Sequence, residues 1–247
     1  MRKRFSVHFF LILLASLSLI ACGNNKSKTE AGDAQAVYER AAKSLASGNY
    51  QSAIQGMEFL SARYPFSSYT KQAQLDLMYA YYKSQQSESA IDAADQFIRE
   101  NPTHPRIDYA YYIKGLVYFE SGPGMLERLF RVDMSARPPR DAEKAFENFS
   151  IITRRFPTSG YLPDARQRMV YLRNRLAQYE VHVAKYYMKR GMFVAAANRS
   201  KFVLERYEGA PSTREALKVL VDAYRELGVD DLAVDVERVL SQNYPNF

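Results

Sequence analysis

The side chains that could perform chemistry in this chain are few and far apart. Cys22 is the only cysteine among 247 residues, and the chain has three histidines, of which His104 and His182 lie in unrelated segments. A single thiol can form no internal disulfide and no cysteine metal cluster. The sequence also contains neither a Gly-x-Ser-x-Gly elbow nor a Gly-x-x-x-x-Gly-Lys phosphate loop. These observations indicate a protein that is not an enzyme and that holds no metal or other cofactor.

Cys22 has a context that predicts a covalent modification. Three cationic residues at positions 2–4 precede the apolar stretch 5–20. That stretch is shorter than the roughly 20 residues of a comfortable membrane span, and the order of features is typical of a secretory signal. Leu-Ile-Ala-Cys follows and resembles the bacterial lipobox, in which the cysteine is acylated and becomes the mature N-terminus. We predict that residues 1–21 are a signal peptide and that Cys22 carries the lipid. By resemblance to enterobacterial-type sorting rules, Gly23 rather than Asp after the cysteine points to the outer membrane and not to retention in the inner one.

The overall charge adds little to this picture. The chain has 34 Lys and Arg against 27 Asp and Glu, a formal charge of +7. The basic residues are interspersed with acidic ones, and an exported protein is a poor partner for nucleic acid. A solvated helix surface is therefore the better interpretation of the positive excess, although such an excess could also attract an anionic surface.

The elements that must position any site are helices that repeat along the chain. We predict an all-α solenoid of five tetratricopeptide-like helix pairs over 35–247, with repeats ending near 65, 102, 157, 208 and 245. Residues 22–34 are polar and small, so we expect a lipidated N-terminus and a flexible tether there; an extra capping helix is the alternative.

Two kinds of small residue recur at fixed places in each repeat. Alanine occurs twelve positions before each repeat end and lets two helix backbones approach closely: Ala53, Ala90, Ala145, Ala196 and Ala233. Seventeen positions before the end, a residue that is usually glycine ends the first helix of the pair in a left-handed conformation: Gly48, Gln85, the displaced Gly122, Gly191 and Gly228. The third repeat departs from the tetratricopeptide pattern at Lys114, a position where the pattern has leucine.

Two repeats are longer than the others. The third has 18 extra residues, which lie between Gly122 and Ala145, and the fourth has 14 extra residues before Gly191. Fourteen residues are about four helical turns, so the fourth repeat is expected to begin with one long helix from about Leu162 to Arg190. The insertion contains Leu129 and Phe130 beside several arginines. It is either a docking knob for a partner or a segment that covers an exposed end of the stack.

Four segments carry a resemblance that goes beyond the repeat pattern. They are RYPFSSYTKQAQLDLMYAYYK (63–83), FIRENPTHPRIDYAYYIKGL (97–116), LFRVDMSARPPRDAEKAF (129–146) and RLAQYEVHVAKYYMKRGMFVAAANR (175–199). With the lipobox, they resemble the BamD (ComL/YfiO) family of outer-membrane assembly lipoproteins across essentially the whole chain. The resemblance implies a lipid-anchored subunit of the β-barrel assembly (BAM) complex on the periplasmic face of the outer membrane.

The family resemblance also implies partners. These are the periplasmic domain of BamA, docked through the C-terminal repeats, other Bam lipoproteins, and the C-terminal segments of unfolded outer-membrane proteins. For BamA we single out charged residues of the last two repeats: Arg199, Arg214, Asp222 and Arg225. A planar guanidinium suits pairing with a carboxylate across an interface. The alternative is that Arg199 is a solvated arginine of little energetic consequence.

The first helices of the N-terminal half supply a candidate groove for the unfolded substrate. Its predicted residues combine aromatic rings with a cation: Tyr38, Tyr79, Tyr82, Lys83, Tyr109, Tyr112 and Phe119. Such a surface could hold an extended peptide with an aromatic tail and a free carboxylate, whereas any one ring could equally be a core residue. Two other functions remain open: a repeat-built lipoprotein of another envelope system, such as a pilus-secretin pilotin, and a cell-wall enzyme or binding module.

Overall fold

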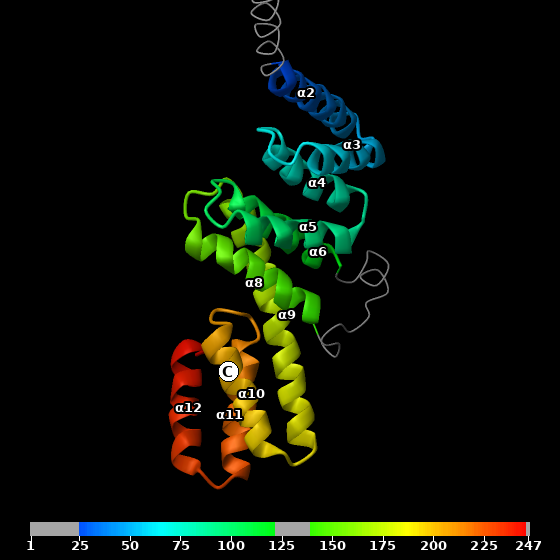
Figure 1. The fold of residues 1–247 in the computed structure, drawn as a ribbon. Helices are drawn as coiled ribbons and strands as arrows, with labels where there is room; N and C mark the ends of the chain where they lie inside the picture. The colour runs from blue at the N-terminus through cyan, green and yellow to red at the C-terminus, as the bar shows by residue number, and fades with distance from the viewer. Residues whose placement is uncertain (1–24, 122–138, 246–247) are drawn as a thin grey trace, which may run out of the picture. The chain divides into compact units, whose positions relative to one another are not determined.

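The computed structural model describes residues 25–121 and 139–245, and these residues form ten helices and no strand. Figure 1 shows them in order along the chain. The helices are α2 (Asn25–Ala46), α3 (Tyr50–Arg63), α4 (Thr70–Lys83), α5 (Ser87–Glu100), α6 (Ile107–Glu120), α8 (Arg140–Arg155), α9 (Leu162–Lys189), α10 (Phe193–Arg206), α11 (Thr213–Glu226) and α12 (Asp230–Asn243).

The chain divides into two compact units, residues 1–93 and 94–247, and α5 crosses the boundary. In the first unit α2 packs on α3, α3 packs on α4, and α2 also contacts α4. In the second unit each of α6, α8, α9, α10 and α11 packs on the helix that follows it, and α9 also contacts α11. Packing on the next helix and on the one after it is solenoid-like, which confirms the predicted all-α class.

The alanine positions of the predicted repeat are buried as expected. Ala53, Ala90, Ala145 and Ala196 are fully buried, and Ala233 is 2% exposed. Another small residue, Gly115, allows two helices of the second unit to approach closely. A Cβ atom on Gly115 of α6 would lie 2.5 Å from the ring of Phe149 on α8, so only glycine fits at this helix contact.

The turns within the helix pairs also follow the prediction. Gly48, Gly191 and Gly228 have positive φ angles between 69° and 79°, and Gln85 reaches φ = 61° at the corresponding position. The left-handed residue ends the first helix of each of these pairs. The α3 helix ends at Arg63, close to the predicted repeat end at 65, and the N–H of Tyr64 donates to the carbonyl of Leu60 just before Pro65.

Helix α9 confirms the long first helix predicted for the fourth repeat. It runs for 28 residues, from Leu162 to Lys189. Its first half packs on α8, where the Thr153 hydroxyl approaches the sulfur of Met169, and its second half packs on α10 and α11 around Ala184. Figure 1 shows α9 alongside α8 at one end and alongside α10 and α11 at the other.

The N-terminal part of the chain differs from the expected tether. Helix α2 begins at Asn25, within the segment 22–34, and Ala34 is fully buried. Leu129 and Phe130, like most of the insertion, lie outside the described residues. No helix among the described residues has the length and apolar character that a membrane crossing requires.

Candidate docking sites

The predicted groove residues of the first unit lie on α2 and α4. The hydroxyl of Tyr38 donates to Oδ2 of Asp76 at 2.9 Å, and its ring stacks on Tyr69 with centroids 5.4 Å apart. The rings of Tyr79 and Tyr82 lie 6.4 Å apart, and Lys83 is exposed beside them. Tyr38 therefore contributes to the packing of α2 on α4, whereas Tyr79, Tyr82 and Lys83 form a neighbouring aromatic and cationic group.

In the second unit, Tyr109 and Tyr112 of α6 meet a tyrosine that precedes α9. Tyr161 stacks on Tyr112 with ring centroids 4.5 Å apart and lies 5.4 Å from Tyr109. The hydroxyl of Tyr112 donates to Oδ2 of Asp164 at 2.9 Å. Burial, together with this hydrogen bond to a carboxylate, raises the pKa of Tyr112 to about 12. The phenol thus stays protonated and holds α6 to the start of α9.

Phe119 lies further along α6, against the first half of α9. The guanidinium of Arg168 sits 4.7 Å from the centre of its ring, and Tyr171 packs edge-on at 5.6 Å. Arg168 also donates from Nε to Asp164 at 2.6 Å. Asp164 therefore links the two groups of rings. The sequence prediction missed Asp164, Arg168 and Tyr171, although the i,i+4 spacing of an acid and an arginine could have indicated the ion pair.

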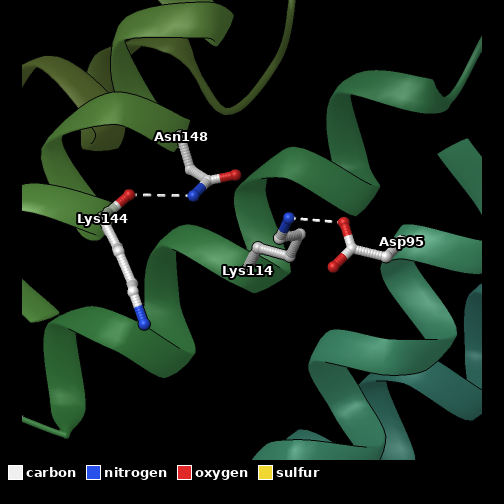
Figure 2. Close-up of polar contacts among 4 residues, drawn as sticks. All are labelled: Asp95, Lys114, Lys144 and Asn148. Carbon is white, nitrogen blue, oxygen red and sulfur yellow. Dashed lines mark hydrogen bonds and ion pairs between the residues drawn. The ribbon is translucent and has the colours of Figure 1, made fainter.

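Lys114, the departure from the repeat pattern, is explained by an ion pair. Its ammonium lies 2.5 Å from Oδ1 of Asp95, and the lysine side chain is only 15% exposed. Figure 2 shows this pair on one side of α6 and, on α8, the buried Asn148, which donates to the carbonyl of Lys144 at 2.8 Å. The Lys144 ammonium lies 5.0 Å from the ring centre of Tyr118. Lys114 of α6 and Asn148 of α8 therefore both have hydrogen-bonding partners.

Arg199, the first of the predicted docking residues, pairs with a buried carboxylate of its own chain. Its Nη1 lies 3.0 Å from Oε2 of Glu180 on α9. The Glu180 side chain is 6% exposed, whereas that of Arg199 is 44% exposed. Removing Arg199 would leave a buried charge without its partner, which is costly. Arg199 thus has a structural role, and its substitution does not test docking alone.

A cleft of about 770 Å³ surrounds this ion pair between α8, α9 and α10. Its lining carries four basic and four acidic side chains: Lys144, Arg154, Arg199 and Arg206, and Glu143, Glu147, Glu180 and Glu205. Burial, and then the nearby charge of Glu180, raises the pKa of Glu143. Burial raises the pKa of Tyr207 to about 12, and the charges of Glu180 and Glu143 contribute to the shift.

The cleft also has an apolar wall. Phe146 and Phe202 each pack edge-on against Tyr207, with ring centroids 6.3 and 5.7 Å apart. Phe202 is 40% exposed, so part of this aromatic row faces solvent. The cleft therefore places a partly exposed aromatic row beside charged side chains of both signs.

The remaining predicted docking residues lie on α11. Asp222 and Arg225 line a groove of about 430 Å³ between α11 and α12, and Arg225 forms an ion pair with Glu237. Asp222 is exposed, and Arg214 is partly buried in the first turn of the same helix. The structure therefore brings Asp222 and Arg225 into one groove, separate from the cleft that holds Arg199.

The predicted lipidation site, Cys22, lies outside the described residues. Among the residues that the structure does describe, no group of three or more histidine, cysteine, aspartate or glutamate side chains could hold a metal ion. What the structure offers instead is a set of interhelical clefts and aromatic surfaces. Fold and sites together define a helical-repeat protein.

Comparison with known proteins identifies the family. Residues 30–239 match the family model described as YfiO, outer membrane lipoprotein. The chain belongs to this family.

Relatives from several bacteria match almost the whole chain, and each is named outer membrane protein assembly factor BamD. The protein of Neisseria meningitidis serogroup A is 38% identical, with 95% of this chain and 90% of the relative covered. That of Xylella fastidiosa Temecula1 is 36% identical, with 97% and 83% covered, and that of Vibrio cholerae serotype O1 is 33% identical, with 94% and 96% covered. A solved TPR protein of Thermus thermophilus gives a TM-score of 0.38 at 17% identity, covering 86% of this chain and 92% of its own, a likeness too weak for any conclusion.

Proposed function

We propose that this protein is a non-enzymatic lipoprotein subunit of the machinery that folds and inserts outer-membrane β-barrel proteins, anchored on the periplasmic face of the outer membrane. The observation that carries the proposal is the identity of 33–38% with relatives named outer membrane protein assembly factor BamD, over nearly the full chain. The lipobox at Cys22 supports the anchor, since two or more acyl chains give stable attachment. No cofactor is required beyond the covalent lipid.

In this role the C-terminal helices dock the periplasmic domain of BamA. The α11–α12 groove is suited to the task because Asp222 is exposed there beside the Arg225–Glu237 ion pair. Charges of both signs favour pairing across an interface over attraction to a membrane. Arg199 acts indirectly, since it neutralises Glu180 and so shapes the wall of the neighbouring cleft.

The aromatic surfaces take up the C-terminal segments of unfolded outer-membrane proteins. In the first unit, Tyr79 and Tyr82 offer ring faces beside the exposed Lys83, which can pair with a terminal carboxylate. In the second unit, Tyr109 and Tyr112 are held by Tyr161 and Asp164, and the ordered rings lose little entropy when a peptide packs on them. Phe119 adds an apolar contact beside Arg168.

The decisive experiment is to extract a tagged full-length protein from its own membranes in mild detergent and to identify the proteins that co-purify. We expect BamA and other Bam lipoproteins. A secretin in place of BamA would contradict the proposal and would favour a pilotin-type lipoprotein of another envelope system.

A pair of matched variants then tests the C-terminal groove. Asp222→Lys reverses an exposed charge in the groove, and Asp92→Lys makes the same change on the exposed side of α5. We expect Asp222→Lys to lower the amount of BamA that co-purifies, with a stronger effect at low salt, because exposed charges are screened. Asp92→Lys should leave the amount of co-purified BamA unchanged. Equal recovery of BamA with both variants would remove this groove from the interface.

A further inference from the structure

The middle of helix α9 is an arginine-rich segment whose charge the proposed docking sites do not use. Between Asp164 and Glu180 the sequence contains four arginines, namely Arg166, Arg168, Arg173 and Arg175, and no acidic residue, lysine or histidine. One side of this segment is core, since Leu172 and Leu176 are 1% and 2% exposed. The opposite side contains Val170 and Tyr171, which are 50% and 43% exposed, and the exposed Arg166 one turn earlier.

Most of this positive charge is not neutralised by described residues. Arg168 forms an ion pair with Asp164. Arg173 donates to the backbone carbonyl of Glu208 at 3.0 Å, which is a neutral acceptor. Neither Arg166 nor Arg175 has an ion pair with a carboxylate in the described part of the chain. The segment therefore presents about three uncompensated guanidinium charges beside a small apolar surface.

Two of these arginines have unused hydrogen-bonding capacity. The Nε atoms of Arg173 and Arg175 are buried and have no hydrogen-bond partner among the described residues. Such groups are uncommon in folded proteins, and each guanidinium carries five donors that favour planar, bidentate acceptors. Both arginines are only partly exposed, so an external carboxylate would pair with their outer Nη groups rather than with the buried Nε atoms.

The aromatic neighbours place this charge next to a binding surface for an apolar side chain. Tyr171 packs edge-on against Phe119 of α6, and Arg168 covers the face of the same ring at 4.7 Å. Tyr171 is thus held in place by its neighbours while part of its ring faces solvent. Arginine and tyrosine are, with tryptophan, the residue types enriched at the energetic centres of protein interfaces.

We propose that the exposed half of this segment docks an acidic protein segment that crosses the helix and in which glutamate or aspartate side chains flank an apolar residue. Arg166 and Val170, four residues apart, lie toward one edge of the exposed half, and Tyr171 and Arg175, also four residues apart, lie toward the other. The carboxylates pair with Arg166 and Arg175, and the apolar residue rests on Val170 and Tyr171. A protein fits better than an anionic lipid surface, because every cation here is arginine and the patch has an ordered aromatic centre. The inference does not depend on the proposed assembly role, since it concerns this surface alone.

The test uses the purified full-length chain in detergent and a fluorescent 14-residue peptide with glutamates around a central phenylalanine and leucine. The peptide carries a C-terminal amide, so that recognition of a terminal carboxylate cannot account for binding. A second peptide with glutamine in place of every glutamate is the matched control. We expect fluorescence anisotropy to report binding of the glutamate peptide, and binding at least about tenfold weaker for the glutamine peptide.

Variants of the protein assign the binding to this face. Arg166→Glu combined with Tyr171→Ala should weaken the glutamate peptide about tenfold. Lys201→Glu, an equal charge change at an exposed position of α10, should leave affinity within about twofold. Arg166→Lys keeps the positive charge but removes the planar guanidinium, so it should cause a loss of affinity smaller than that of the double variant. Circular dichroism checks that each variant is folded.

Three results would overturn the proposal. One is equal binding of the two peptides. Another is an equal loss of affinity in the Lys201→Glu control and the double variant. The third is binding to phosphatidylglycerol vesicles, abolished by the double variant, in the absence of peptide binding, because this would assign the face to a lipid surface.

Discussion

Gln85 occupies a backbone conformation that its side chain disfavours. Its φ of 61° places it in the left-handed region, where the equivalent turns of other helix pairs have glycine. An L-residue with a Cβ atom costs roughly 1–2 kcal/mol in this conformation. The turn between α4 and α5 therefore holds a strained residue that a single substitution can relieve.

We expect Gln85→Gly to raise the free energy of unfolding by about 1 kcal/mol, because the relief of strain exceeds the greater entropy of glycine in the unfolded chain. Urea denaturation followed by circular dichroism measures the change. Gly191→Ala, in the turn between α9 and α10, is the control and should lower stability by about the same amount. A loss of stability in Gln85→Gly would mean that the glutamine side chain makes contacts that outweigh its backbone strain.

Residues that a repeat pattern specifies by their size were predictable from the sequence. The five alanines are buried at helix contacts, and Gly48, Gly191 and Gly228 have the predicted left-handed turns, whereas Gly122 lies outside the described residues. Size and backbone conformation depend on the position within the repeat, so they can be read from spacing alone. The partners of charged residues are different. Glu180 pairs with Arg199 and Asp95 with Lys114, in each case from a neighbouring helix, and no periodicity specifies which two side chains meet.

At the scale of the helices, the contact between α6 and α8 depends on one position without a side chain. The Cβ that an alanine would add at Gly115 meets three ring atoms of Phe149 within 3 Å, and Phe149 itself is fully buried. The same contact supports the aromatic surface at Tyr112, whose ring lies 6.1 Å from that of Phe149.

Gly115→Ala should therefore lower the free energy of unfolding by about 1–3 kcal/mol, the usual range for overpacking a core. Thermal and urea denaturation measure the loss. Gly160→Ala is a suitable control, since a Cβ there meets nothing within 4 Å and the glycine does not have a positive φ. If both variants melt like the wild type, then α6 and α8 can separate more easily than their packing indicates.

Helix boundaries and the long helix α9 were predictable because proline, glycine and the length of the insertion locate them. The surfaces of α9 were not. The ion pair of Asp164 with Arg168 is local, but the partners of Asp164 and Tyr171 on α6, Tyr112 and Phe119, lie about 50 residues away in the sequence. Those non-local contacts decide which tyrosines of α6 are held in place, and a helical pattern does not specify them.

For the whole molecule, attachment to the membrane depends in our proposal on the thiol of Cys22. Cys22→Ser should move the protein from the membrane fraction to the soluble periplasmic fraction, because the described residues contain no helix able to cross a membrane and no acyl chain can be attached. Fractionation followed by immunoblotting measures the change. The intact mass of the wild-type protein should exceed that of the processed chain by the mass of the lipid, and a mass equal to the bare chain would rule out the anchor.

Helix α9 also affects how the second unit unfolds. Repeat proteins usually lose structure one repeat at a time, because each repeat contacts only its neighbours. Here one helix of 28 residues, about 42 Å long, belongs to the core around α8 at one end and to the core around α10 and α11 at the other. Fraying from the C-terminus can remove α12 and α11 singly, but opening the contact with α10 exposes a helix whose other half is still packed. Amide hydrogens of α9 should therefore exchange in a single cooperative step, later than those of α12.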